Sequence, residues 1–213
     1  MSLAGSLAAS STQAMMPSQR PPPVYTALHT LRLWVRTSSD LHGVPERCPH
    51  LLKLGLWNRT WSPIAASSEL LHMSSSLHFL TDLHIHCFVV TADFLSSLAH
   101  LDHLVYLGLT YLRMTDAMCA VLGEATPRMQ RLSLGGNDGL TTAGVRTLAL
   151  KMTGLSLLYL CESAMDETTL SHVFVNESLF QELHTLYVAF PPSEKFRKTV
   201  REHRPRCVVK QWR

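Results

Sequence analysis

The sequence lacks any long apolar run, and few of its residues are charged. Of its 213 residues, 46% are hydrophobic and 16% are charged, which is enough apolar material to bury a continuous core and excludes disorder throughout. No apolar run reaches the roughly 18 residues that a membrane-spanning helix requires. The first residues also lack the compact apolar segment behind a basic leader that marks a secretory signal. We therefore expect a soluble cytoplasmic protein without membrane association.

Paired cysteines and catalytic motifs are also missing. The five cysteines are spread singly, with no C-x-x-C pair, so the sequence predicts buried thiols rather than a disulfide framework or a zinc knuckle. No nucleophile has a recognisable base partner. The glycine-rich residues 135–139 lack the lysine and following hydroxyl residue of a phosphate-binding loop and are interpreted as a turn. We expect no enzyme activity and no cofactor.

The chain does contain an apolar hexad, L-x-x-L-x-L with conservative replacements, that occurs seven times. The hexads begin at Leu28, Leu51, Leu80, Leu104, Met129, Leu155 and Leu183. Their first residues are 23, 29, 24, 25, 26 and 28 positions apart. Such a period indicates a solenoid in which each repeat is one supersecondary unit.

Each hexad predicts one short parallel strand. Alternation directs the fourth and sixth positions into the core and the third, fifth and seventh positions outward. The chain between hexads has helix-start residues followed by apolar stripes, which predicts helical return segments. The predicted starts lie at Thr91, Thr115, Thr141 and Asp166.

The fifth repeat, residues 129–150, gives the clearest resemblance to a known family. Its hexad is followed by Gly135, Gly136 and then Asn137 at the ninth place, where a side-chain amide can bond the backbone of the strand exit. Residues 28–190 resemble the leucine-rich repeat superfamily, in particular the helix-containing repeats of ribonuclease-inhibitor-like and F-box-associated proteins. The resemblance implies an α/β solenoid with strands on the concave face and helices on the convex face. No F-box-like segment precedes the repeats.

Two departures from the family pattern predict irregular curvature. Asn58 and Cys87 sit one place before the ninth position, and Cys161 sits two places before it. The second repeat is long and rich in serine between residues 67 and 76, which we interpret as an irregular insertion.

Three segments follow from these patterns: a tail at 1–23, a solenoid at 24–190 and a basic capping unit at 191–213. The tail is rich in serine and alanine and ends in three prolines, which predicts disorder; the absence of acidic residues before Asp40 leaves a mitochondrial transit peptide as the alternative. In the capping unit Ser193 is the expected helix start, Phe196 and Val200 form an apolar pair, and residues 207–209 read as a final strand.

Charge is concentrated at the C-terminal end. Residues 194–213 contain eight lysines or arginines against two glutamates, a local charge of +6, whereas the whole chain has +3. This segment could contact RNA. The N-terminal end shows no comparable cap, so we expect either a partner or further repeats to cover it.

Large aromatic and charged side chains occupy the outward positions of the hexads, and residues of these types are enriched in binding hot spots. The predicted partner-binding residues are Arg32, Trp34, Lys53, Trp57, Asp82, His84, His86, Tyr106, Arg131, Tyr159 and Tyr187. His84 and His86 flank Ile85 on one strand and suggest a metal site, but the matching places of the neighbouring repeats supply no good third ligand. We expect solvent-facing histidines and no metal.

Two functional hypotheses follow. The first is a non-enzymatic scaffold or adaptor that holds a protein partner on the concave face, since repeat stacks form wide, rigid surfaces. The alternative is a ribonucleoprotein or mitochondrial assembly component whose basic C-terminal segment contacts RNA.

Overall fold

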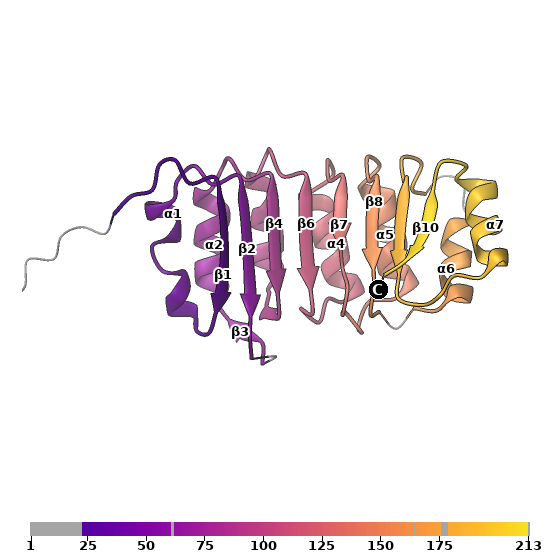
Figure 1. Cartoon of the computed structure of the whole chain (residues 1–213), viewed down its shortest axis with the longest axis horizontal. Helices are drawn as coiled ribbons and strands as arrows, with labels where there is room; N and C mark the ends of the chain where they lie inside the picture. The colour runs from indigo at the N-terminus through magenta and orange to yellow at the C-terminus, as the bar shows by residue number, and fades with distance from the viewer. Residues whose placement is uncertain (1–22, 61, 164, 176–178, 213) are drawn as a thin grey trace, which may run out of the picture.

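The computed structural model describes residues 23–60, 62–163, 165–175 and 179–212, so nearly all of the expected N-terminal tail lies outside the described residues. Eight parallel strands form one sheet in the order β1-β2-β4-β6-β7-β8-β9-β10 (Figure 1). They are β1 (Thr30–Val35), β2 (Lys53–Asn58), β4 (Asp82–His86), β6 (Tyr106–Thr110), β7 (Arg131–Ser133), β8 (Leu157–Leu160), β9 (Thr185–Val188) and β10 (Val208–Gln211). The seven predicted strands and their parallel pairing are confirmed, and residues 208–211 add the eighth.

The strands are aligned hexad to hexad. Leu54 of β2 pairs with Leu83 of β4, which pairs with Leu107 of β6, and the same register continues through Leu132 and Leu158. All five side chains are buried in one continuous core. The predicted inward direction of the fourth position is therefore confirmed, and hydrophobic burial along this row stabilises the stack.

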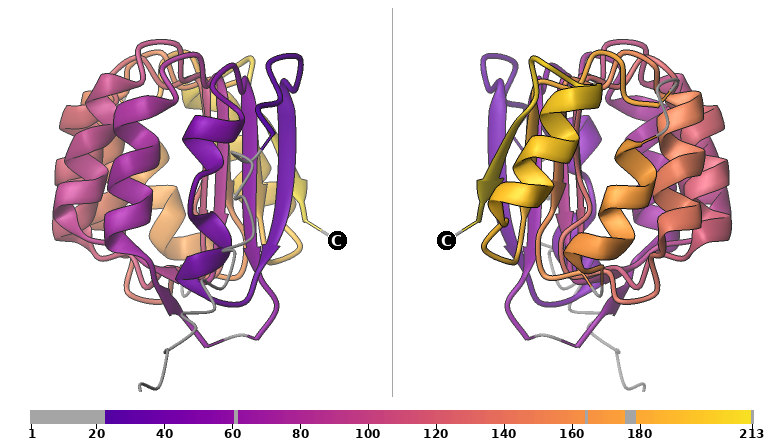
Figure 2. Two further views of the ribbon diagram at one scale, coloured as in Figure 1. Left: turned by 90° about the vertical axis from the view of Figure 1, so that its left-hand side faces the viewer. Right: turned by 90° about the vertical axis from the view of Figure 1, so that its right-hand side faces the viewer.

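Helical segments return the chain behind the sheet, so strands and helices form two layers (Figure 2). They are η1 (Ser38–Leu41), α1 (Val44–Arg47), α2 (Ser67–Ser76), α3 (Ala92–Ser97), η2 (Leu98–His100), α4 (Asp116–Ala125), α5 (Thr142–Lys151), α6 (Glu167–Phe174) and α7 (Glu194–His203). No helix among the described residues is long and apolar enough to cross a membrane. The layers are those of a leucine-rich repeat solenoid, with the strands on its concave side. We call this side the strand face.

Five of these helices begin at the capping residues that the sequence predicts. Thr91, Thr115 and Thr141 accept hydrogen bonds from backbone N–H groups in the first turns of α3, α4 and α5. Asp166 and Ser193 do the same for α6 and α7. Each cap satisfies a donor that has no partner within the helix.

The second repeat has additional length, as predicted, but its serine-rich stretch is not the irregular part. Its serines lie inside α2, where the buried Ser74 hydroxyl bonds the carbonyl of Leu71 and the hydroxyl of Ser97 at 2.6 Å. The additional length instead forms β3 (Ile64–Ala65), which pairs in parallel with β5 (Phe88–Val89) beside the main sheet.

Buried asparagines join neighbouring repeats at the strand exits. The Asn137 amide donates to the carbonyls of Leu109 and Leu134, and its oxygen accepts from the N–H groups of Leu112 and Met114. Asn58, one place early, also donates to the next repeat through the carbonyl of Cys87. A displaced asparagine therefore still bridges the repeats, because its side chain is long enough to reach the next strand exit.

The two ends of the stack differ in burial. At the N-terminal end, Leu31 and Leu33 are only half-buried, although they pack against the core. At the C-terminal end, Phe196 and Val200 of α7 and Val209 of β10 are buried. The last strands are thus covered by apolar side chains, whereas the first strand leaves part of its inward surface accessible.

Candidate functional site

Four rings lie side by side across the first half of the strand face. The Trp34 and Trp57 ring centroids are 6.0 Å apart, and Trp57 stacks on His84 at 5.2 Å with an interplanar angle of 20°. His84 in turn lies 6.4 Å from the Tyr106 ring. We call these four residues the N-terminal aromatic cluster. They come from β1, β2, β4 and β6.

Glycines make room for these rings. A Cβ atom at Gly55 would overlap the Trp57 ring, and one at Gly108 would overlap the imidazole of His84. Both glycines face outward in register with His84. The rings can therefore lie down on the backbone of the sheet, which fixes their orientation before any partner binds.

A second cluster occupies the last strands. Tyr159 and Tyr187 stack with centroids 4.3 Å apart and an angle of 9°, and Trp212 contacts both rings edge-on at 5.7 and 6.0 Å. Lys210 lies over the Tyr187 ring at 5.6 Å. We call Tyr159, Tyr187 and Trp212 the C-terminal aromatic cluster. Lys210 and Trp212 are not among the predicted binding residues, although continuing the alternation of the last strand directs both outward.

Charged side chains form a row near the strand entrances. The Asp82 carboxylate is 3.8 Å from the Lys53 ammonium and 3.2 Å from the Arg131 guanidinium. Arg131 reaches Asp82 across Tyr106, with its guanidinium 5.4 Å from the ring centroid. These contacts join three predicted binding residues in one network. The position of the Arg131 guanidinium is stabilised by both the Asp82 carboxylate and the Tyr106 ring.

The two histidines of β4 do not converge on a metal position. His84 Nε2 and His86 Nδ1 both meet the Thr110 hydroxyl, at 3.2 and 3.0 Å. No group of three histidine, cysteine, aspartate or glutamate side chains among the described residues is arranged to hold a metal ion.

Both histidines face outward and line the groove, but they are less exposed than expected, because their side chains are half-buried beside their aromatic neighbours. Burial, together with the smaller effect of the adjacent His86, lowers the pKa of His84 to about 4. Burial also lowers the pKa of His86, while the charge of Glu162 opposes that shift. Both imidazoles are therefore neutral at pH 7.

A groove of about 620 Å³ lies between the two aromatic clusters. Its central surface is formed by small outward residues: Thr110 of β6, Ser133 of β7 and Gly135, which follows β7. It is lined by Trp34, Trp57, Asn58, Arg59, His84, His86, Tyr106, Thr110, Tyr111, Ser133, Gly135, Tyr159, Cys161, Glu162 and Trp212. The groove therefore has aromatic walls and a polar edge.

Tyr111 and Glu162, which are not among the predicted binding residues, enter the groove through a feature of their backbone. Both have a positive φ, 56° and 54°, as do Cys87 and Gly136 at the same place of their repeats. The Tyr111 ring lies over Gly136, where a Cβ would be 2.6 Å from it, and contacts His86 at 4.9 Å. Of these four residues, only Gly136 is of a type that commonly adopts this left-handed conformation, so only Gly136 indicates it in the sequence.

All eleven predicted binding residues lie on the strand face, but not in one place. Trp34, Trp57, His84, His86, Tyr106 and Tyr159 line the main groove. Arg32, Lys53 and Asp82 line a smaller hollow of about 260 Å³ next to it. Arg131 and Tyr187 line neither hollow but contact residues of the main groove: Arg131 lies over the Tyr106 ring, and Tyr187 stacks on Tyr159. Their role in partner binding stays a prediction.

The cysteines are all buried and free, as expected. Burial raises the pKa of Cys119 to about 12 and those of Cys161 and Cys207 to about 11. Their thiols therefore stay protonated near neutral pH and are poor nucleophiles. Cys161 borders the groove without supplying a reactive group.

Comparison with known proteins identifies a fold and no closer relationship. No protein-family model matches the sequence, and no curated protein matches it. Among solved structures, an internalin from Listeria monocytogenes str. 4b F2365 is similar, with a TM-score of 0.53 and 22% sequence identity. The similarity covers 85% of this chain and 46% of that chain, so this chain spans less than half of the internalin's length. At this level of identity the likeness shows the leucine-rich repeat fold alone, and the subtype of the repeats stays a prediction.

Proposed function

We propose that this protein is a non-enzymatic interaction module that binds a protein partner on its strand face. The observation that carries the proposal is the exposure of large rings at both ends of the groove: Trp34 is 65% exposed and Trp212 is 50% exposed. Exposed tryptophans that border a preformed groove have the residue type and shape of an interaction hot spot. Scaffold and adaptor roles both belong to this class.

The rigid setting of the rings supports binding rather than chemistry. Their stacking and the underlying glycines hold the rings in place, so little conformational entropy is lost when a partner binds. The titratable groups of the groove offer little for catalysis, because His84 and His86 are neutral and share the Thr110 hydroxyl rather than activating a nucleophile. An adaptor fits these features better than an enzyme.

The test compares variants of the two faces by affinity purification and quantitative mass spectrometry. Trp57→Ala and Tyr159→Ala should each weaken capture of the same partners by roughly thirtyfold in affinity, about 2 kcal/mol, with little change in Tm. Glu124→Ala is the control, because Glu124 lies on the convex face in an exposed ion pair with Lys151. Normal capture by both strand-face variants would refute the proposal.

RNA binding through the C-terminal segment is the second candidate, favoured by the local charge of +6. Two of these cations serve the fold: Arg197 donates to the carbonyl of Val209, and buried Arg204 donates to that of Leu179. Nuclease treatment that removes the captured partners would favour this candidate, since phosphate contacts dominate such binding. Import of a reporter fused to residues 1–23 would test the associated mitochondrial localisation against a cytoplasmic one.

A further inference from the structure

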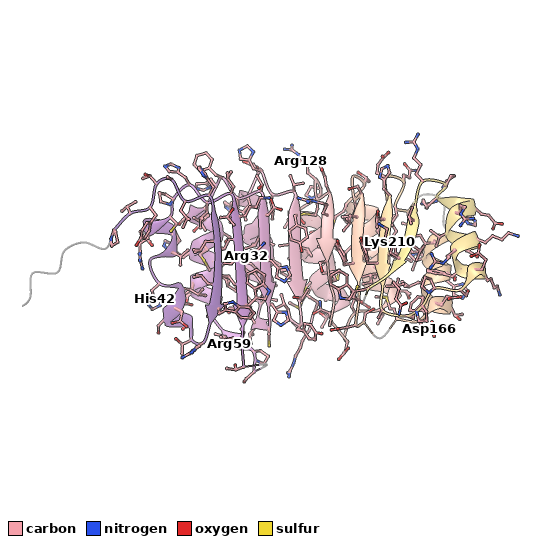
Figure 3. The ribbon with its side chains drawn as sticks, in the orientation of Figure 1. Arg32, His42, Arg59, Arg128, Asp166 and Lys210 are labelled. Atoms are coloured by element: carbon pink, nitrogen blue, oxygen red, sulfur yellow. The ribbon has the colours of Figure 1, made fainter. Side chains whose placement is uncertain are left out.

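The strand face carries an excess of positive charge. The outward positions of the eight strands hold four basic side chains, Arg32, Lys53, Arg131 and Lys210, against the single carboxylate of Asp82. Asp82 lies between Lys53 and Arg131 and offsets one of the four charges. Figure 3 shows Arg32 and Lys210 toward opposite ends of the sheet, so positive charge flanks the groove on both sides.

The groove itself adds no net charge. Glu162 and Arg59 are the charged residues that line it, and they offset each other. The two histidines do not add to the positive charge at neutral pH, because burial lowers both pKa values. A partner on this face therefore meets an uncharged aromatic hollow within a basic surface, and an acidic partner is electrostatically complementary to it.

Ser133 is one of the small residues that leave the middle of the hollow open. Ser133 of β7 pairs in register with Tyr159 of β8, which pairs with Tyr187 of β9. A tyrosine at residue 133 would continue the stack of the C-terminal aromatic cluster and fill the groove. Serine leaves that space free between aromatic walls, where an apolar side chain would lose contact with water.

We propose that this hollow receives an aromatic or large aliphatic side chain from an acidic, extended segment of the partner protein. The inference rests on the proposed function and specifies the chemistry of the partner. Single-stranded nucleic acid fits less well, because bases need free ring faces and, apart from the exposed Trp34 and Trp212, the rings around the hollow already have a face occupied. Trp57 is stacked on His84, Tyr159 on Tyr187, and cations cover one face each of Tyr106 and Tyr187.

The first experiment selects ligands from a random peptide display library against the full chain. The selected peptides are then labelled, and their binding is measured by fluorescence anisotropy. We expect them to share an aromatic or large aliphatic residue flanked by aspartate and glutamate. Ser133→Tyr should weaken their binding at least about tenfold without lowering Tm, whereas Ser133→Ala should change it less than about twofold.

A second pair of variants tests the charge. Arg32→Glu and Lys210→Glu should each weaken binding about tenfold at low salt and reduce its salt dependence, because they remove attraction at the rim. Arg146→Glu is the matched control, since Arg146 is an exposed residue of α5 on the convex face. It changes the net charge equally and should leave the affinity nearly unaltered.

Several results would overturn the inference: no enriched peptides, peptides that are basic or lack an apolar anchor, or full binding by Ser133→Tyr. If Ser133→Tyr binds normally while Trp57→Ala does not, the strand face still binds protein and only the anchor assignment fails. If neither variant affects binding, the proposed function fails as well. A uridine oligonucleotide could instead compete with the peptides for the full chain. If it does, and if this competition is lost in Arg32→Glu, the ligand of this face is RNA rather than an acidic protein segment.

Discussion

Replacement of Asn137 is expected to destabilise the solenoid more than a typical polar substitution. The side chain is 0% exposed and makes four hydrogen bonds of 2.8 to 3.1 Å to the backbone of two repeats. At about 1 kcal/mol net for each bond, Asn137→Ala should lower the free energy of unfolding by about 4 kcal/mol. For a chain of this size, this corresponds to a fall in Tm of roughly 8 to 16 °C.

Asn137→Asp distinguishes the hydrogen bonds that the side-chain oxygen accepts from those that the amide nitrogen donates. The carboxylate keeps acceptors for the Leu112 and Met114 N–H groups but turns an oxygen toward the carbonyls of Leu109 and Leu134. Burial and these carbonyls favour the protonated acid, so the folded pKa should be raised above about 3.9. The stability of this variant relative to the unchanged protein should therefore be greatest below about pH 4, and this contribution should be lost as the pH rises through the raised pKa.

Urea unfolding followed by circular dichroism measures both effects. Asp138→Ala is the control, because Asp138 is the exposed neighbour of Asn137 and should change stability by less than about 0.5 kcal/mol. A loss below about 1 kcal/mol in Asn137→Ala would refute the reasoning, since it would mean that the four backbone groups find other partners without cost.

Three further outcomes are expected. Leu132→Ala, at a fully buried position, should cost about 2 to 5 kcal/mol in urea unfolding, and a loss below about 1 would contradict its inward direction. Deleting residues 191–213 should lower Tm and solubility by exposing the core beneath Phe196 and Val200; unchanged stability would contradict a capping role. Because His84 stays neutral in the fold down to a pKa of about 4, protonation of the unfolded chain should lower stability from about pH 6.5 to pH 4, by up to about 3 kcal/mol. His84→Gln should flatten this part of the stability curve, and an unchanged curve would count against the buried neutral imidazole.

Periodicity predicted the fold because the solenoid repeats one physical requirement. Leu54, Leu83 and Leu107 must face one core, so their spacing shows in the sequence, and the caps at Thr115 and Asp166 satisfy a local need at each helix start. The serine-rich second repeat was misread for the opposite reason. Its serines form hydrogen bonds within α2 and, through Ser74, to Ser97 of the next repeat. The second kind of contact depends on a distant residue rather than on local composition.

The site was only partly predictable, because its shape depends on neighbours across strands. Alternation directed Trp57 and His84 outward but could not show that Gly55 and Gly108 let their rings lie on the sheet. Nor could it show that burial would lower the pKa of His84. Tyr111 was missed because its left-handed backbone has no signature in a residue other than glycine.

The contrast between Ser133 and Tyr159 separates what the fold requires from what binding would require. The two residues occupy the same outward position on adjacent strands, and Tyr159 shows that this position accepts a tyrosine that stacks on its neighbour. A tyrosine at residue 133 would bury more apolar area, so stability alone does not favour serine there. If Ser133→Tyr raises Tm and removes peptide binding, the open groove is maintained at a cost in stability, as expected for a binding site. If it raises Tm and leaves binding intact, the partner does not use this hollow, and loss of binding in Trp57→Ala would then be needed to keep the partner on the strand face.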